Sequence, residues 1–271
     1  MISVGSEKMR RFFVPLMIVV LIFLLSGCIW GDKPLPKIAL IDDSHANRFG
    51  GEESEFFDGI IAILAAKGYD YKYSSVEGFE PQNYAIVILS MPNASYSASD
   101  IDKLETQLGK KGKIIMMDML VEITPASTFF LDALSDGLNT GIGFVWGVVT
   151  DTVNNIGGNK MIITSDSSTT HPLSSSLSAK IAMMVATKLT VEGNASVAIF
   201  AESSAIFTTY VPLSGDEVTY VPQVSEPIPI VAASNVGGGK VVAISSAYAF
   251  TGTLMGIVPG NTDLFRAVVD W

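Results

Sequence analysis

The chain has 271 residues, of which 48% are hydrophobic and 16% charged, and its formal net charge is −10. This acidic balance argues against nucleic-acid binding, because phosphate recognition requires a basic face. The chain is also too rich in hydrophobic residues, and too poor in charge, to be a disordered acidic segment. A chain of this length buries enough apolar surface to fold without disulfide bonds.

The beginning of the chain has the pattern of an export signal. Lys8, Arg10 and Arg11 are followed by an apolar run at residues 12–25, and then by Leu25-Ser26-Gly27-Cys28. These last four residues resemble the lipobox of bacterial and archaeal lipoproteins, in which an aliphatic residue and two small ones precede a cysteine. The resemblance implies cleavage before Cys28 and attachment of lipid to its sulfur.

Cys28 is the only cysteine in the chain. An exported protein with one thiol cannot form an internal disulfide bond, so a lipid anchor gives this cysteine a role. We therefore predict a signal peptide at residues 1–27, a lipidated cysteine with a proline-stiffened tether at 28–36, and a single domain at 37–271. The alternative is an uncleaved signal-anchor, although the apolar run is shorter than the ~20 residues that span a membrane.

The first half of that domain alternates between strand and helix patterns. Continuous apolar runs predict buried strands at residues 37–41, 84–89 and 113–117, and a shorter strand is expected at 71–74. The helix after the first strand ends at Lys67-Gly68, and the helix before residue 113 begins with a capping box of Ser97 and Asp100. This alternation predicts a mostly parallel sheet in a three-layer, flavodoxin-like α/β/α sandwich.

The second half reads as strands added to that sheet in antiparallel order. We expect a helix at 129–138, a strand at 144–150, a loop rich in serine and threonine at 164–178, and a helix at 177–187. Short strands follow at 195–200, 206–211 and 218–221, and a hairpin joins 228–233 to 240–245 across three glycines. Gly157-Gly158 marks another hairpin turn, and the last helix is expected to begin near Asn261 or Thr262.

Polar residues gather where the first and central strands end. In a flavodoxin-like sheet the switch point lies between these strands, and ligands bind outside the carboxyl ends of strands at such points. The candidate crevice is lined by Asp42, Asp43, Ser44, His45, Asn47 and Arg48 on one side, faced by Ser90 and Asn93, with Asp118 nearby.

Two chemical interpretations of this crevice are open. His45 beside Asp42 or Asp43 suits proton transfer or metal binding, and a pair of His45 with His171 would complete a three-ligand metal site. Asp and Ser after a strand, however, often only turn the chain by bonding to their own backbone. We therefore expect binding of a ligand or partner by these loops, with no catalytic residue, metal or cofactor.

Several segments together resemble the class I glutamine amidotransferase-like superfamily. They are the Ile41-Asp42-Asp43-Ser44-His45 strand end, Ser90-Met91-Pro92, Asp166 with His171-Pro172, the Gly237–Val242 hairpin, and the closing segment from Asn261 to Trp271. The arrangement is closest to the non-catalytic branch seen in uncharacterised membrane-linked proteins and in auxiliary parts of gliding-type ABC transport systems.

The chain departs from the enzymes of that superfamily at the nucleophile. Those enzymes carry a cysteine on a sharp turn after a central strand, whereas the equivalent strand here leads into Asp118-Met119-Leu120. Because the sole cysteine is Cys28, cysteine-based glutaminase chemistry is excluded. Gly-x-Ser-x-Gly is absent as well.

The resemblance and the export signal together predict a lipid-anchored protein on the outer side of the cell membrane. Its non-catalytic domain would bind a partner protein or small ligand, as an accessory to a membrane transport complex. One alternative is a hydrolase that uses His45 and adjacent carboxylates, with or without a metal. Another is a solute-binding lipoprotein of an ABC transporter, although such receptors have two lobes. Asn93 and Asn194 match the N-glycosylation pattern, which occurs often by chance.

Overall fold

The domain is built on a sheet with the strand order β2-β1-β3-β4-β15-β14-β11-β8-β7, in which β9 pairs with β8. The computed structural model describes residues 33–49, 55–120, 126–166, 170–212, 218–223 and 226–271. Leu35–Trp271 forms one compact unit. In the described ranges no helix combines the length and the apolar character needed to cross a membrane.

The parallel half of the sheet contains the strands that the apolar runs predict. They are β1 (Ile38–Asp42), β2 (Asp70–Tyr73), β3 (Ile86–Ser90) and β4 (Lys113–Met117), and β15 (Gly239–Ile244) joins them. All five are parallel, and Ala39, Ile86, Lys113 and Lys240 lie in register across four of them. Every residue of β3 and β4 is buried, as expected for strands covered on both faces.

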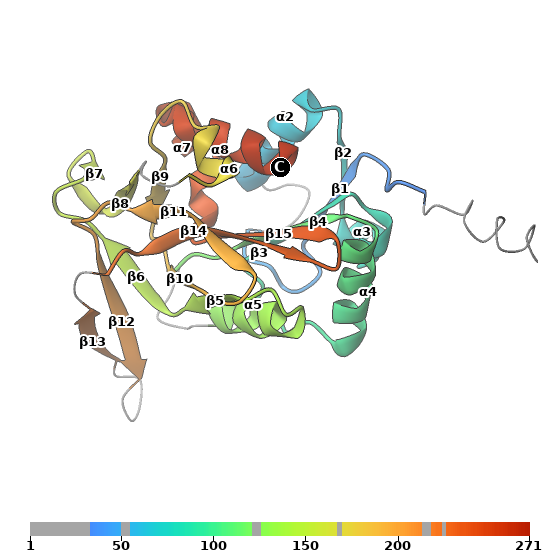
Figure 1. Ribbon diagram of the computed structural model, residues 1–271, viewed down its shortest axis with the longest axis horizontal. Helices are drawn as coiled ribbons and strands as arrows, with labels where there is room; N and C mark the ends of the chain where they lie inside the picture. The colour runs from blue at the N-terminus through green and yellow to red at the C-terminus, as the bar shows by residue number, and fades with distance from the viewer. Residues whose placement is uncertain (1–32, 50–54, 121–125, 167–169, 213–217, 224–225) are drawn as a thin grey trace, which may run out of the picture. The chain divides into compact units, whose positions relative to one another are not determined.

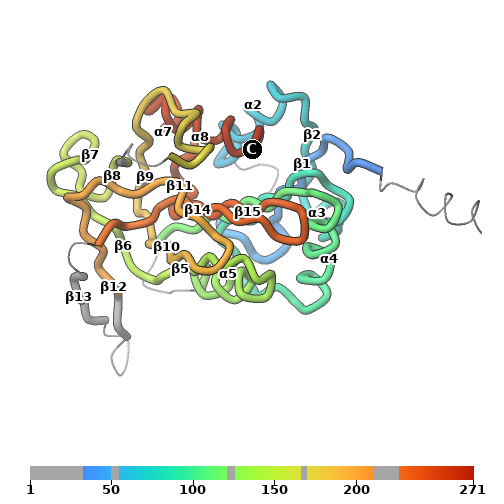
Figure 2. Tube along the Cα trace, viewed as in Figure 1, coloured from blue at the N-terminus to red at the C-terminus, as the bar shows by residue number. Residues whose placement is uncertain are grey.

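The antiparallel half begins at the hairpin of β14 (Pro229–Val236) and β15, which crosses the middle of the view in Figures 1 and 2. Gly237 and Gly238 have φ angles of 60° and 96°, which glycine adopts without strain and which a two-residue turn requires. Beyond it lie β11 (Ala195–Ala201), β8 (Asn159–Asp166), β7 (Asn155–Ile156) and β9 (Ala182–Met184). The predicted fold class is thereby confirmed.

Helices cover the two faces of the sheet (Figure 1). Ile41, Ile88 and Met117 face a core shared with α2 (Asp58–Ala66) and α8 (Pro259–Asp270), which we call the α2/α8 face. Their neighbours along each strand face a second core with α4 (Ala98–Gly109) and α5 (Ala126–Gly137), the α4/α5 face. This alternation follows from the two-residue period of a strand.

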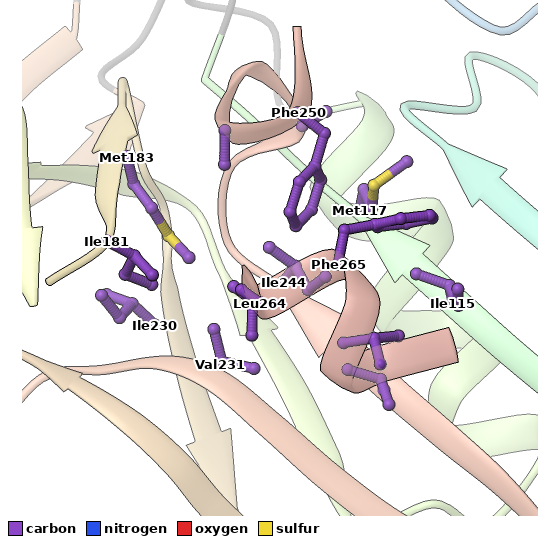
Figure 3. Packing of buried hydrophobic residues seen from close by; sticks show 14 of the residues in the cluster. Ile115, Met117, Ile181, Met183, Ile230, Val231, Ile244, Phe250, Leu264 and Phe265 are labelled. Carbon is purple, nitrogen blue, oxygen red and sulfur yellow. The ribbon is translucent and has the colours of Figure 1, made fainter. Parts of the chain in front are cut away.

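The core of the α2/α8 face is shown in Figure 3. Phe250 of the 3-10 helix η3 (Ala247–Phe250) packs against Phe265 of α8 at a ring-centre distance of 5.0 Å. Met117 and Ile244 come from the sheet, and Met183 comes from β9. Strands from both halves of the sheet therefore share one core.

The remaining short elements flank these layers. They are η1 (Glu55–Phe57), α3 (Ser74–Glu77), η2 (Pro81–Asn83), α6 (Pro172–Ser175) and α7 (Gly252–Ile257). Two small sheets lie beside the main one: β10 (Lys188–Val191) pairs with β5 (Ile142–Val145), and β12 (Ile206–Pro212) pairs with both β6 (Gly147–Thr150) and β13 (Val218–Gln223).

The strand predicted at 144–150 is two strands in different sheets, so that prediction is wrong. Gly147 begins β6, separated by one residue from the end of β5, with a φ of 156°, and a Cβ atom there would meet the carbonyl oxygen of Thr208 at 2.4 Å. The glycine therefore allows the chain to leave one sheet and join another.

The helix predicted at 177–187 is also wrong, because β9 occupies part of it. Residues 182–184 pair with β8, and Asn261 bonds both the amide and the carbonyl of Ala182. The predicted loop at 164–178 contains the end of β8 and the short helix α6. The last helix begins at Pro259, before Asn261, because proline is favoured in a first turn.

Candidate functional site

The centre of the candidate site is the carboxylate of Asp42, the last residue of β1, which is fully buried. Its Oδ1 accepts hydrogen bonds from the hydroxyls of Ser44 at 2.9 Å and Ser74 at 2.8 Å. Its Oδ2 accepts one from the hydroxyl of Tyr96 at 2.8 Å and lies 2.9 Å from Nδ1 of His45. The buried charge is therefore surrounded by donors, which is what a carboxylate in an interior requires.

His45 lies between two carboxylates and two aromatic rings. Its Nδ1 faces Asp42, and its Nε2 lies 3.6 Å from Oδ2 of Asp100 in the first turn of α4. The rings of Tyr96 and Phe79 lie 4.0 and 4.7 Å from the imidazole, centre to centre. Only 9% of His45 is exposed.

This arrangement shifts the pKa of both partners in opposite directions. Burial acts to raise the pKa of Asp42, but the hydrogen bond and positive charge of His45, together with the hydrogen bonds from Tyr96 and Ser74, hold the pKa below the usual value. Burial acts to lower the pKa of His45, but Asp42 and then Asp100 raise it above the usual value. Both pKa shifts therefore favour the ion pair of ionised Asp42 with a protonated imidazole.

Asp100 also caps α4, as the sequence predicts. The hydroxyl of Ser97 accepts a bond from the Asp100 amide, and the Asp100 carboxylate accepts one from the Ser97 amide, so the capping box is confirmed. The same carboxylate thus caps the helix and faces His45. This double role joins the loop after β1 to the start of α4.

Backbone contacts bring the two predicted sides of the crevice together. The amide of Asn93 donates to the His45 carbonyl at 3.0 Å, and the amide of Arg48 donates to the Met91 carbonyl at 3.1 Å. The side chain of Asn47 donates to the Ser90 carbonyl at 2.8 Å. The loops at 43–49 and 91–97 therefore pack as one unit at the carboxyl edge of the sheet.

Three residues of these loops have left-handed backbone conformations without being glycine. Ala46, Phe49 and Met91 have φ angles of 51°, 62° and 44°. Each such conformation costs on the order of 1 kcal/mol and persists only where surrounding contacts impose it. Their clustering is typical of a functional site.

Phe49 presents an aromatic surface beside this network. Its ring stacks on Phe56 at 5.0 Å with the planes 10° apart and lies 6.1 Å from Tyr248 of η3. The guanidinium of Arg48 lies 5.7 Å from the Phe49 ring. Phe49 is 36% exposed, whereas Phe56 and Tyr248 are half-buried. We call Phe49, Phe56 and Tyr248 the aromatic cluster.

The other predicted crevice residues have local roles. Asp43 accepts bonds from the Ser75 amide and from the hydroxyls of Ser74 and Ser75. The Ser90 hydroxyl is buried, and no described residue bonds to it. By strand alternation Ser90 shares the α2/α8 face with Ile86 and Ile88.

Asp118 lies at the same edge but belongs to a separate group. It is fully buried and accepts bonds from the hydroxyls of Ser127 at 2.6 Å and Thr128 at 2.7 Å, both in α5. Burial raises the pKa of Asp118, and these two bonds oppose the rise. None of the hydrogen bonds described for the Asp42 network includes Asp118, and its place in one crevice with Asp42 stays a prediction.

The hypothesis that His45 and His171 form one metal site is wrong. His171 packs 5.6 Å from the ring of Trp271, which lies over Lys240 at the beginning of β15. His45 follows the end of β1, and the two strands are in parallel register, so the histidines lie at opposite edges of the sheet. The described residues contain no group of three or more His, Cys, Asp or Glu suited to a metal ion.

Two surface pockets, each lined by described residues, lie away from this site. One of about 650 Å³ is lined by Asp132, Asp136, Glu192 and the turns at 139–143 and 190–194. The other, of about 370 Å³, lies between Pro172 and the last turns of α8. Neither contains a predicted site residue.

Sequence reasoning missed three residues that complete the network. Tyr96 and Ser74 bond Asp42, and Phe79 packs against His45. No motif identifies the two that bond Asp42, because they are 32 and 54 residues from it in sequence. The sequence identifies Asp100 only as a helix cap, since its approach to His45 depends on how α4 packs.

Comparison with known proteins gives a fold without a family. No known protein family and no curated protein matches the chain. Among solved structures, the N-terminal domain of mmIFT52 is similar, with a TM-score of 0.62 and 16% identity over 86% of this chain and 96% of that one. The cytoplasmic protein STM3548 from Salmonella typhimurium has a TM-score of 0.50 and 14% identity over 87% and 98%. The chain shares their fold.

A protein described as ThuA-like from Parabacteroides merdae has a TM-score of 0.48 and 12% identity, over 88% of this chain and 89% of that one. At identities this low, structural likeness establishes the arrangement of strands and helices alone.

Proposed function

We propose that this protein is a lipid-anchored, extracytoplasmic member of the class I glutamine amidotransferase-like superfamily that binds a partner protein without catalysis. The observation that carries the binding role is the aromatic cluster, held at the carboxyl edge by a loop with strained backbone at Phe49. Strain of this kind is retained where it positions a surface for recognition.

The absence of catalysis is supported by how the polar groups are used. The carboxylates of Asp42 and Asp118 each accept hydrogen bonds from neighbouring hydroxyls, and both ring nitrogens of His45 face carboxylates. A general base needs a nitrogen that can reach a substrate proton. The alternative of a hydrolase built on His45 therefore gains no support from this geometry.

The superfamily assignment is supported by the strand order and by the segment after β4. The order β2-β1-β3-β4 with parallel pairing is flavodoxin-like, as the sequence resemblance implies. Where the enzymes of the superfamily carry a cysteine, this chain has the buried Asp118. A solute receptor with two lobes is disfavoured, because Leu35–Trp271 is one compact unit.

The anchor is supported by the sequence alone, since Cys28 lies outside the described residues. The basic start, the apolar run and Leu25-Ser26-Gly27-Cys28 predict export and lipidation. Association with a membrane transport complex is the function that the resemblance to gliding-type auxiliary proteins suggests. The partner surface would then be apolar, with an aromatic or aliphatic side chain that packs on the aromatic cluster.

Two further features fit a recognition surface at this edge. The buried hydroxyl of Ser90 has no partner among the described residues, although its carbonyl is held by Asn47. An unpaired buried hydroxyl costs free energy that selection tolerates at functional positions. Phe49 keeps 36% of its surface exposed although it stacks on Phe56.

The test is affinity purification of the full chain from native membranes, with quantitative mass spectrometry of the proteins that accompany it. Phe49→Gly removes the exposed ring and relieves the backbone strain, so the fold is retained. Phe129→Ala is the matched control, because Phe129 is 56% exposed in α5 on the other side of the sheet. We expect a partner that is lost with Phe49→Gly and kept with Phe129→Ala.

The anchor is tested separately with Cys28→Ser. We expect the mass of the wild-type chain to include a lipid and that of this variant to lack one, because the sulfur that would accept the lipid is absent. A wild-type chain without lipid at Cys28 would refute the anchor. A set of partners unchanged by Phe49→Gly would refute the binding surface.

A further inference from the structure

The ring of His45 bridges the end of β1 and the first turn of α4. Its Nδ1 contacts Asp42 at the end of β1, and its Nε2 faces Asp100 in the first turn of α4. The backbone of His45 also accepts a hydrogen bond from Asn93, in the loop that leads to α4. The ring and this backbone bond therefore both tie the 91–97 segment and the start of α4 to the loop after β1.

A neutral imidazole has one N–H group and one lone pair, whereas an imidazolium has two N–H groups. Only the protonated ring can face two carboxylates favourably at the same time. When the ring loses a proton, the closer contact with Asp42 at 2.9 Å keeps the remaining hydrogen on Nδ1. The lone pair of Nε2 then points toward the carboxylate of Asp100, and the two repel each other.

We propose that His45 is a proton-dependent latch that holds the loop at 91–97 and the start of α4 against the loop at 43–49. This proposal rests on the proposed function, because it describes regulation of the same binding edge. The closed latch fixes the loop that carries Phe49 and so preorganises the aromatic cluster for its partner. The open latch leaves both loops in place on their backbone bonds but less restrained.

Two negative charges face the His45 ring, as a proton-dependent contact requires. Among the described residues no positive charge faces it. The titratable groups that face it are Asp42 from β1, Asp100 from α4 and the Tyr96 hydroxyl from the loop before α4. Phe79 closes the remaining side with an uncharged ring. Burial, followed by the charge of Asp42, raises the pKa of Tyr96 well above its usual value, so Tyr96 stays neutral throughout.

The direction of the response follows from these partners. Asp42 and Asp100 raise the pKa of His45, so the latch is closed in acid and opens as the pH rises through that raised pKa, which lies above 6.5. The ion pair with Asp100 is partly exposed, and such pairs change local equilibria by about three- to fivefold. The latch therefore changes how tightly the loop at 91–97 is held and leaves the fold intact.

The test is amide hydrogen exchange of the full chain over a pH series, corrected for the intrinsic pH dependence of exchange. The protonation of His45 is followed in parallel by NMR of its ring. We expect exchange at residues 93–100 to accelerate about three- to fivefold as His45 deprotonates. Asp100→Asn keeps the oxygen that caps α4 but removes the charge, and should abolish the step.

Ser97→Ala serves as the control for helix capping, because it removes the cap hydroxyl and its bond to Asp100 Oδ2 but keeps the carboxylate charge that faces His45. This variant should exchange faster at every pH and keep the step. The latch is overturned if His45 titrates without a change in exchange, or if the step survives in Asp100→Asn. A step in exchange without any partner that depends on Phe49 would overturn the proposed function alone.

Discussion

Nδ1 of His45 lies 2.9 Å from Oδ2 of Asp42, a carboxylate with no exposed surface. An ionised group in such a place is stable only with a partner, and removal of one member leaves the other buried and uncompensated. The pair therefore ties the stability of the domain to pH.

The free energy of unfolding should depend on pH because folding shifts the pKa values of His45 and Asp42 in opposite directions. The folded pKa of His45 lies above 6.5, so its contribution is complete below pH 6.5 and is lost as the pH rises through the folded value. The folded pKa of Asp42 lies below 3.8, so its contribution is complete above pH 3.8 and is lost as the pH falls through the folded value. Urea unfolding across a pH series measures both.

His45→Gln provides the control for that measurement. The variant should lose the decline above pH 6.5 while remaining less stable than the wild type in acid. His171 does not interfere in this window, because burial and the charge of Lys240 lower its pKa below 6.5. Parallel curves for wild type and variant above pH 6.5 would contradict the ion pair.

Tyr96→Phe should destabilise the domain by about 1.5–3 kcal/mol, since it removes a hydrogen bond to a buried charge. Its hydroxyl donates to Asp42 at 2.8 Å in the interior. Tyr71→Phe is the matched control: Tyr71 is 40% exposed in β2. Its change should stay within about 0.5 kcal/mol. Denaturant midpoints of the two variants decide this, and equal midpoints would remove Tyr96 from the network.

Phe49→Gly should be more stable than Phe49→Ala by a net of about 0.5–1 kcal/mol. The backbone strain that alanine retains exceeds the extra entropy that glycine gives to the unfolded chain. Both variants lose the stacking on Phe56, but only glycine adopts the φ of 62° without strain. Equilibrium unfolding of the pair measures the difference directly. An alanine variant that is the more stable of the two would show that Phe49 is unstrained.

Asn261→Ala should be one of the most damaging polar substitutions, with a loss of about 3 kcal/mol or more. The buried side chain bonds the amide and carbonyl of Ala182 and the carbonyl of Ala249, so it links α8 to β9 and η3. Thr262→Ala is the matched control, because it alters the adjacent, partly exposed position in the same helix and should cost little. Thermal unfolding of both variants tests the contrast, and similar losses would show that Asn261 does not link these elements.

The elements that the sequence predicts well are those whose local pattern and tertiary role agree. The runs at 84–89 and 113–117 are short and apolar almost throughout. Such a run is typical of a strand that is covered on both faces. The capping box of Ser97 and Asp100 and the Gly237-Gly238 turn depend on neighbours in sequence, so they could also be predicted. The errors fall where the tertiary context decides.

Residues 182–184 illustrate that limit. Their short apolar pattern fits a helix or a strand, and pairing with β8 together with the bonds from Asn261 selects the strand. At 144–150 the pattern predicts one strand, but the close approach of Thr208 to Gly147 divides it between two sheets. Neither partner is near in sequence.

The sequence by itself determined the alternation of parallel strands and helices, the place of Asp42 and His45 at a strand end, and the lack of a cysteine after β4. Only the tertiary structure decided that His45 meets Asp42 and Asp100 at once and lies far from His171. The physical reason is the separation along the chain over which each kind of interaction acts. Hydrophobic periodicity and capping act between near neighbours along the chain, whereas the partners of a buried charge are chosen by the packing of whole elements.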